Sequence, residues 1–540
     1  MSETWEVLVQ KKQADEAAKI PAEWRLPAEF TKDISETEST NVLDVPRRCG
    51  ILSEKQLDIT EKNDATSLLE KIHRGELSAY EVTEAFCIRA AIAQQVTRCL
   101  TETLFDRALQ RAKDLDEHLK TTSKIVGPLH GLPISFKDCF NIEGVCSTIG
   151  FTSFINNGPV KSNSAIVEIL VGLGAIPYVK TNIPQTMMAA DSHNYVFGRT
   201  LNPNRSNIGA GGSSGGEGAL IAMRGSVLGV GTDIAGSIRI PAICNGGFAF
   251  KPSTDRIPYA GLTSPGRPGL TGIKPSAGPL ATSVRDLELF MRLVTNEDPW
   301  KVDSSIIFSP WRPVKKSTDP LRIGYIQEDR LWPVHPPVLR ALTQARSKLE
   351  EAGHQVIPLD TPSLNDATLL SFRMFSMDPG ATAFKHIAAS GEPTIPALAS
   401  TSLPHKYMPY DFAPMTLESL YDLNVSRIKF KEEFRSLINE ANLDAIIMPG
   451  YQGTAQPHDL YGFPPYTVLW NLMDYPACII PFGKAESSQD AAYLRDVEYK
   501  PPYEAESVEG APCCVQLAGR NMHDEEVLQI AEIVSKVLGN

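Results

Sequence analysis

The chain has 540 residues and a formal net charge of −12, with 42% hydrophobic and 21% charged residues. This composition is typical of a globular protein with a large buried core, and the acidic balance without a Lys/Arg-rich run argues against nucleic acid or an anionic membrane as a partner. No uncharged apolar run reaches transmembrane length and no signal-peptide core follows Met1, so we expect a soluble, cytoplasmic protein.

Residues 1–125 are predicted to form a helical N-terminal extension. Ser78 and Glu81 have the spacing of a capping box at the start of one helix, and Gly75 ends the helix before it. These are signals of local structure rather than of function.

From residue 126 onward, short strand-like and helical segments alternate. This alternation predicts the α/β class, and we expect residues 126–540 to form one domain with a mixed central β-sheet flanked by α-helices on both faces. The irregular segment 299–320 is the predicted internal boundary, and the polar stretch 484–510 is predicted to be a surface loop. The predicted strands are 132–138, 175–180, 321–326 and 445–448, and the predicted helices include 166–170 and 337–352.

Cysteine and histidine spacing argues against the common metal sites. The nine cysteines match no zinc pattern, and the ten histidines include no His-x-x-x-His pair. An odd number of cysteines fits a reducing compartment, where free thiols pack as small hydrophobic groups. We therefore expect no metal, no cofactor and chemically inert thiols.

Lys137 ends the strand-like run 134–137, whose apolar neighbours predict at least partial burial. Two structural interpretations are open: the lysine pairs with the adjacent Asp138, or its ammonium group extends to solvent. A role as a base would instead require a neutral amine. Its pKa would have to fall by roughly three units from about 10.4, which desolvation in an apolar pocket can supply.

A glycine-rich segment, 209–218, lies further along the chain. Gly211 and Gly216 have the separation found in a phosphate-binding P-loop, but Glu217 follows where that motif needs lysine. Ser214 stands where a dinucleotide-binding fingerprint needs its third glycine. Neither kind of nucleotide site is therefore indicated.

Segment 209–218 leaves two structural interpretations. It is either a flexible Gly/Ser linker or a tight turn at the start of a buried helix. The apolar run 219–223 follows directly and favours the turn, in which free backbone N–H groups point at whatever lies there. A second segment, 232–237, also combines glycine with a final serine, which suggests that two serines are set up for chemistry.

Together these segments resemble the amidase signature family, and the whole chain is most similar to its fungal acetamidase or general amidase branch. The spacing of Ser213 and Ser237 matches the family, and the resemblance extends from about Gly127 to the C-terminus. It implies the amidase signature fold for residues 126–540. The matching segments are His130–Asp138, Lys180–Gln185, Gly211–Gly216, Gly231–Arg239 and Lys251–Pro252.

The resemblance implies hydrolysis of an amide C–N bond through an acyl-enzyme. Ser237 would be the nucleophile, Ser213 the bridging serine after a cis peptide bond, and Lys137 the base. Neutral Lys137 would take a proton from Ser213, which would take one from Ser237, so no histidine is required. Asp233 and Arg239 are expected to hold the second turn rather than to react.

The same resemblance implies an oxyanion hole made of backbone N–H groups from residues 234–237. Ala235 departs from the commoner Gly-Gly-Ser pattern, which restricts the turn but removes no donor. The implied substrate-binding residues are Met187, Ser213, Ile234, Ala235, Gly236 and Ser237.

The substrate is the least defined expectation. Small aliphatic amides are expected for the branch, and aryl or indolyl amides would fit an aromatic lining. A glutamine-hydrolysing amidotransferase subunit, a fatty acid amide hydrolase-like enzyme and a non-catalytic scaffold are the alternatives, and a homodimer is the family-level expectation. Further pocket candidates, each with core packing as its alternative, are Met188, Met374, Phe375, Met377, Tyr451 and Trp470.

Overall fold

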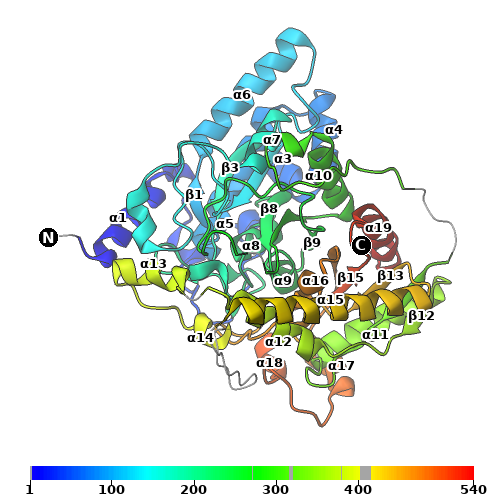
Figure 1. Cartoon of the computed structure of the whole chain (residues 1–540). Coiled ribbons are helices and arrows are strands. Elements are labelled where there is room, and N and C mark those ends of the chain that lie inside the picture. Colours follow the sequence, from blue (N-terminus) through cyan, green and yellow to red (C-terminus); the bar gives the residue numbers. More distant parts are fainter. Residues whose placement is uncertain (1–2, 271, 315–319, 379, 402–414) are drawn as a thin grey trace.

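A computed structural model describes residues 3–270, 272–314, 320–378, 380–401 and 415–540 (Figure 1). Its centre is an 11-stranded sheet that contains both parallel and antiparallel neighbours. The predicted α/β class with a mixed central sheet is therefore confirmed. In sheet order the strands are β1 (Leu100–Thr103), β3 (Ile176–Thr181), β2 (Pro133–Lys137), β8 (Leu228–Asp233), β10 (Ser276–Ala281), β9 (Phe248–Lys251), β14 (Ala477–Lys484), β15 (Pro512–Ala518), β13 (Ala445–Met448), β11 (Arg322–Tyr325) and β12 (Gln355–Pro358).

Helices cover both faces of this sheet. Helices α8 and α9 pack together on one face, whereas α10, α11 and α19 pack on the other, as predicted. The α-helices are α1 (Trp5–Ala18), α2 (Val45–Arg48), α3 (Glu54–Glu61), α4 (Ala65–His73), α5 (Ala79–Thr97), α6 (Phe105–Thr122), α7 (Ala165–Gly172), α8 (Gly215–Ala222), α9 (Arg239–Asn245), α10 (Val284–Asn296), α11 (Pro336–Glu351), α12 (Leu364–Phe375), α13 (Thr382–Ser390), α14 (Ala397–Thr401), α15 (Leu417–Glu440), α16 (Pro465–Met473), α17 (Ser487–Asp490), α18 (Ala505–Val508) and α19 (Asp524–Leu538).

Short elements fill the connections. Strands β4 (His193–Asn194) and β5 (Gly198–Arg199) form one ribbon, and β6 (Leu201–Asn202) and β7 (Arg205–Gly209) form another. The 3₁₀ helices are Ala22–Trp24, Ala28–Phe30, Thr152–Asn157, Gln185–Met187, Pro299–Lys301 and Ala491–Tyr493.

The N-terminal 125 residues contribute to the sheet as well as to the helical layer. The capping box at Ser78 and Glu81 is confirmed, because each residue's side chain bonds the other's backbone N–H at the start of α5. Strand β1 pairs antiparallel with β3 and forms one edge of the sheet. The division of the chain at residue 125 stays a prediction.

Two predicted irregular regions have different outcomes. Segment 484–510 was expected to be a loop but carries α17, α18 and the 3₁₀ helix Ala491–Tyr493, because short helices leave little periodic signal in a polar sequence. Segment 299–320 begins with a 3₁₀ helix and is otherwise irregular as far as residue 314, and residues 315–319 lie outside the described residues.

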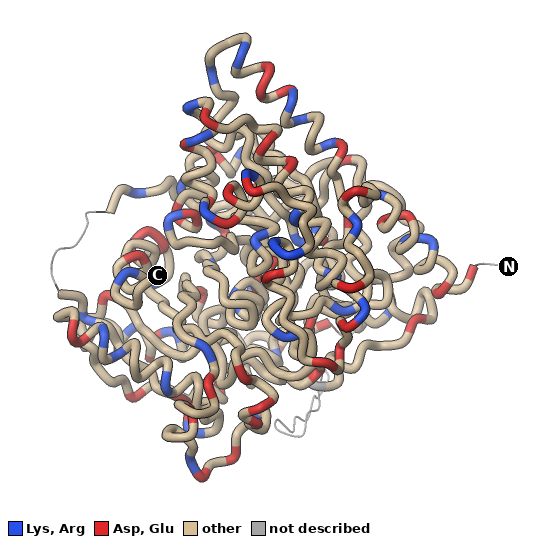
Figure 2. Tube along the Cα trace, turned by 180° about the vertical axis from the view of Figure 1, so that it is seen from behind, with Lys and Arg blue, Asp and Glu red and all other residues tan. Residues whose placement is uncertain are grey.

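The surface mixes charges of both signs. Seen from behind, acidic and basic residues are interspersed along the helices (Figure 2). In the part of the chain that the structure describes, no helix is both long enough and apolar enough to cross a membrane. Within the same residues, no three His, Cys, Asp or Glu side chains are grouped so as to hold a metal ion.

Candidate active site

Three elements meet where the candidate residues lie. Strands β2 and β8 are parallel neighbours, with Ser135 opposite Gly229. Lys137 and Thr232 therefore both lie near the carboxyl ends of these two strands. Helix α8 packs on these strands and begins just after Ser213. The topology therefore brings together side chains that are far apart in sequence.

Lys137 is fully buried and bonded to two hydroxyl groups. Its Nζ lies 2.7 Å from Ser213 Oγ and 2.8 Å from Thr232 Oγ1. Burial lowers the pKa of Lys137 to about 8, against the opposing effects of Cys139, Asp233 and Glu217. A neutral amine is therefore accessible near physiological pH.

Both structural interpretations of Lys137 are wrong. The side chain does not reach solvent, since its exposed fraction is 0%. Asp138 instead forms a buried ion pair with Lys180, 3.2 Å away, and accepts hydrogen bonds from Thr101 Oγ1 at 2.7 Å and Ile149 N at 2.7 Å. Lys180 thus neutralises the carboxylate and leaves Lys137 to the two hydroxyl groups.

The first glycine-rich segment is a buried turn, so the flexible-linker interpretation is wrong. The peptide bond between Gly212 and Ser213 is cis, as the family resemblance implied. A Cβ on Gly212 would lie 2.4 Å from the carbonyl oxygen of Ala189, and one on Gly216 would lie 2.3 Å from the backbone nitrogen of Asn182. The glycines allow the backbone to pack this closely.

The second segment, 232–237, is held by a buried carboxylate. Asp233 Oδ1 accepts a hydrogen bond from Gly236 N at 2.8 Å, and Oδ2 accepts one from Ile238 N at 3.1 Å. Arg239 donates to both oxygens at 3.0 Å. Burial alone would raise the pKa of Asp233, but the Arg239 guanidinium lowers it to about 2. Asp233 is therefore a permanent anion that shapes the turn.

Gly236 gives this turn a conformation that other residues rarely adopt. Its φ is 125°, and a Cβ would lie 2.3 Å from Thr467 Oγ1. Thr467 donates to the carbonyl oxygen of Ala235 at 2.7 Å. The backbone N–H of Gly236 is already donated to Asp233, so this donor is engaged within the turn.

The two turns contact each other directly. Ser214 N donates to the carbonyl oxygen of Ser237 at 3.2 Å. Within the largely buried second turn, Ile234, Ala235 and Ser237 are only half-buried. The partly exposed part of this turn is therefore the stretch that includes Ser237.

The remaining pocket candidates are scattered. Met187 is half-buried in the 3₁₀ helix Gln185–Met187, and Met188 is 39% exposed. Trp470 and Tyr451 are fully buried, Trp470 against Tyr475 at 6.0 Å between ring centroids and Tyr451 on Tyr461 at 3.8 Å. These two aromatic residues belong to the core, and core packing was the alternative to a place in the substrate pocket. The other three lie with the core around α12, Met374 buried within it and Phe375 and Met377 partly buried against it.

Several residues of the site were not assigned a role from the sequence. Thr232 could have been identified, because it stands directly before Asp233 within a segment that matches the family. Thr467, Asn471 and Gln516 come from the C-terminal part of the chain, where no local motif marks them. Asn471 donates to Asp233 Oδ1 at 2.9 Å, and Gln516 accepts from Arg239 at 2.8 Å.

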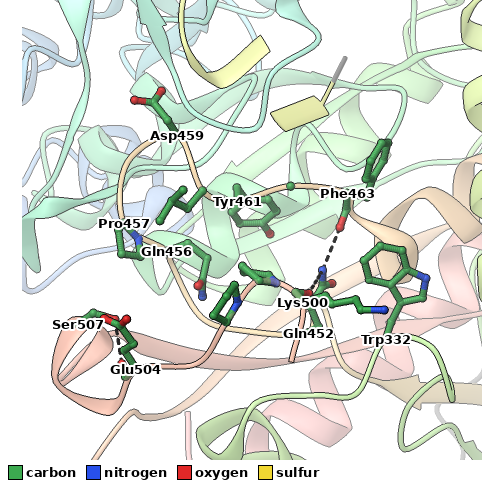
Figure 3. Close-up of a pocket in the computed structure, with 14 residues that line it drawn as sticks. Trp332, Gln452, Gln456, Pro457, Asp459, Tyr461, Phe463, Lys500, Glu504 and Ser507 are labelled. Carbon is green, nitrogen blue, oxygen red and sulfur yellow. Dashed lines mark hydrogen bonds between the residues drawn. The ribbon is translucent and has the colours of Figure 1, made fainter. Parts of the chain in front are cut away.

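A separate hollow of about 210 Å³ lies between the loop after β13, the segment that leads into α18, and Trp332 from the loop before α11 (Figure 3). Trp332, Tyr461 and Phe463 line it, whereas the three residues expected to be catalytic are not among its lining residues. Its wall meets the first glycine-rich segment through Gln456, whose carbonyl oxygen accepts from Gly209 N at 2.8 Å. The hollow therefore adjoins the site without containing it.

Known proteins match this chain over nearly its full length. The family model named Amidase matches residues 81–528. An amidase from Gibberella moniliformis is 38% identical and an acetamidase from Emericella nidulans is also 38% identical, each over at least 99% of both chains. A solved fatty acid amide hydrolase is 33% identical, with a TM-score of 0.90, over 99% of this chain and 95% of that one.

The matches define a hydrolase that acts on the C–N bond of carboxylic amides. The chain belongs to the Amidase family, so the predicted membership of the amidase signature enzymes is confirmed. A bacterial aryl acylamidase of the same signature, 20% identical with a TM-score of 0.70, shares the fold.

Proposed function

We propose that this amidase hydrolyses small aliphatic or aryl amides through an acyl-enzyme on Ser237, with Ser213 as the bridging group and Lys137 as the base. The observation that carries the proposal is the 2.7 Å contact between Lys137 Nζ and Ser213 Oγ in a fully buried setting. Burial favours the neutral amine, which is the form that can accept a proton.

The hydroxyl partners suit a neutral lysine. A neutral amine has two hydrogens and one lone pair, so it can donate to Thr232 Oγ1 while it accepts the proton of Ser213 Oγ. The 2.8 Å contact with Thr232 would then hold the lone pair towards Ser213. Thr232 acts in this proposal as a positioning residue.

The proton relay accounts for both half-reactions. Lys137 accepts the proton of Ser213, Ser213 accepts that of Ser237, and Ser237 Oγ attacks the carbonyl carbon. The relay then runs in reverse and protonates the leaving nitrogen as the C–N bond breaks, which leaves an acyl group on Ser237. Water attacks this ester in the second half-reaction and gives up a proton to the same relay. The relay returns that proton to Ser237 Oγ as the acyl C–O bond breaks, and the product acid leaves and ionises to the carboxylate.

Oxyanion stabilisation is assigned to backbone N–H groups beside Ser237. Since the Gly236 N–H is donated to Asp233 at 2.8 Å, the proposal rests on the N–H groups of Ile234, Ala235 and Ser237. Each such donor contributes a factor of about 10²–10³ in rate. Met187 is proposed to contact the substrate because it lies half-buried in the segment that the family resemblance assigns to the pocket.

Variants test the roles. Ser237→Ala is expected to abolish both turnover and labelling by a serine-directed fluorophosphonate, Lys137→Ala to remove most activity, and Ser213→Ala much of it. Ser488→Ala, at an exposed serine on α17, is the control and should behave as wild type. Full labelling of the Ser237→Ala protein would overturn the assignment.

The substrate class needs a panel measured without ATP or tRNA. Ammonia release from acetamide, benzamide, indole-3-acetamide and a long-chain fatty amide separates small-amide from fatty-amide specificity. The likeness to the fatty acid amide hydrolase structure favours including the long chain as a second candidate. Turnover of the fatty amide alone would replace the small-amide proposal, and no ammonia from any of them would favour the amidotransferase alternative.

A further inference from the structure

Glu217 is a buried carboxyl group that the proposed relay does not use. It lies on α8 with an exposed fraction of 0%. It accepts hydrogen bonds from Ser135 Oγ on β2 at 2.6 Å and from Thr181 Oγ1 on β3 at 2.8 Å. Among the residues that the structure describes, no cation forms an ion pair with it. Burying a carboxylate without a counter-charge is costly, so its protonation state is open to change.

The hydrogen-bond network around Glu217 has room for one more proton. Ser135 Oγ also lies 2.9 Å from Ser226 Oγ, which contacts the carbonyl oxygen of Leu228 at 3.0 Å. With the two contacts of the carboxyl group itself, the network has four contacts of at most 3.0 Å, and the hydroxyl groups of Ser135, Ser226 and Thr181 supply only three hydrogens for them. A protonated Glu217 would supply the fourth, from its carboxyl group to Ser135 and onward through Ser226 to Leu228. The network thus stabilises the neutral acid as well as the carboxylate.

The same network lies beside Lys137. Ser135 and Lys137 are two residues apart on β2, so their side chains point to the same face of the sheet. Thr181, the other partner of Glu217, is the direct neighbour of Lys137 in the pairing of β2 with β3. Two residues of strand span about 7 Å, which places the Glu217 carboxyl group within electrostatic reach of the amine.

We propose that Glu217 and Lys137 titrate as a coupled pair, so that ionisation of Glu217 keeps the proton on Lys137 and sets the pH at which the lysine can act as a base. This inference rests on the role of Lys137 proposed above. In this proposal Glu217 touches neither substrate nor the reacting atoms. It is a positioning residue, which acts only through the effect of its charge on the protonation of Lys137.

The two groups change charge in the same pH range. Burial raises the pKa of Glu217 to about 7 and lowers that of Lys137 to about 8. Interacting groups this close in pKa lose their protons in steps that belong to the pair.

Other titratable groups nearby keep a constant charge there. Asp233, which faces Lys137, stays ionised against Arg239, and burial raises the pKa of the Cys139 thiol to about 11. On the Glu217 side, burial raises the pKa of Cys99 to about 12 and that of Tyr178 well above its usual value. Within this cluster Glu217 is therefore the neighbour whose charge changes as Lys137 titrates.

The Glu217→Gln variant isolates the effect. Glutamine keeps an acceptor for Thr181 and a donor for Ser135, and so resembles the neutral acid at every pH. Without the negative charge, Lys137 loses its proton more readily. The acid limb of kcat/KM is expected to move to lower pH by about one unit, with the plateau retained.

The experiment compares pH profiles of ammonia release from acetamide and of fluorophosphonate labelling for wild type, Glu217→Gln and a control. Glu350→Gln, at an exposed glutamate on α11, is the control and should leave the acid limb in place. An unchanged acid limb in Glu217→Gln would overturn the proposal. A Lys137→Ala variant with wild-type rate would instead overturn the role of the lysine, so the two failures are distinguishable.

A second variant covers the case in which Glu217→Gln does not fold. Thr181→Val removes one hydrogen bond that stabilises the carboxylate, so Glu217 stays neutral to higher pH and the acid limb should again move to lower pH. An acid limb that stays at the wild-type position in a folded Thr181→Val protein would overturn the coupling.

Discussion

Replacing Lys137 with Met is expected to change stability in opposite directions at neutral and alkaline pH. Burial lowers the pKa of Lys137 from 10.5 to about 8, a difference of about 3 kcal/mol at roughly 1.4 kcal/mol per unit. Because the folded-state pKa lies below the unfolded one, the unfolded chain binds more protons between these values. Lys137 therefore costs stability below about pH 8, and this cost disappears as the pH rises through about 10.5.

Methionine removes this cost together with two hydrogen bonds. The contacts of Nζ with Ser213 and Thr232 are worth about 1 kcal/mol each. At pH 7 the Lys137→Met protein should thus be about 1 kcal/mol more stable than wild type, and above about pH 10.5 it should be about 2 kcal/mol less stable.

Urea unfolding at both pH values measures the difference, provided that the m-value is unchanged. Ionisable groups that do not interact with Lys137 contribute equally to the two proteins and cancel. Lys120→Met is the control, because the Lys120 side chain is 80% exposed, and it should change stability by less than about 0.5 kcal/mol at either pH. A stability difference between Lys137→Met and wild type that does not depend on pH would refute the reasoning.

Two further substitutions test the second turn, and a labelling experiment tests the thiols. Asp233→Asn leaves the buried guanidinium beside it without a counter-charge and should lower the free energy of unfolding by about 3–5 kcal/mol in urea; a loss below about 1 kcal/mol would contradict this. Gly236→Ala places a Cβ 2.3 Å from Thr467 Oγ1 at a φ of 125°, and ammonia release should fall at least about tenfold, so near-wild-type turnover would be the contrary result. Of the nine thiols, only the half-buried Cys49 and Cys146 should react quickly with a thiol reagent in the native protein, and fast reaction of a third would count against the described burial.

Short-range patterns predicted the parts of the site that lie on single elements. The apolar run before Lys137 indicated a buried strand, and the apolar run after the first glycine-rich segment indicated a buried helix start. Both predictions depend on neighbouring residues alone. The interpretation of Lys137 as a partner of Asp138 failed because the sequence does not show that β3 brings Lys180 to the same carboxylate.

Long-range contacts were beyond such patterns. Arg239 bonds Asn471 and Gln516, which lie 232 and 277 residues away in the sequence. Only the sheet order, in which strands from the C-terminal part adjoin β9, brings these segments together. Single positions such as Asn471 have no periodicity, so no local signal could have identified them.

The place of β15 in the sheet has a consequence for synthesis of the protein. This strand lies between β13 and β14 in the sheet, although it comes after both of them in the chain. While the polypeptide is being made, β13 and β14 each lack a partner on that side until residue 512 and its successors have left the ribosome. Unpaired strand edges recruit other chains. A message cut short before this strand should therefore yield a protein that aggregates unless chaperones hold it, rather than a soluble protein that merely lacks activity.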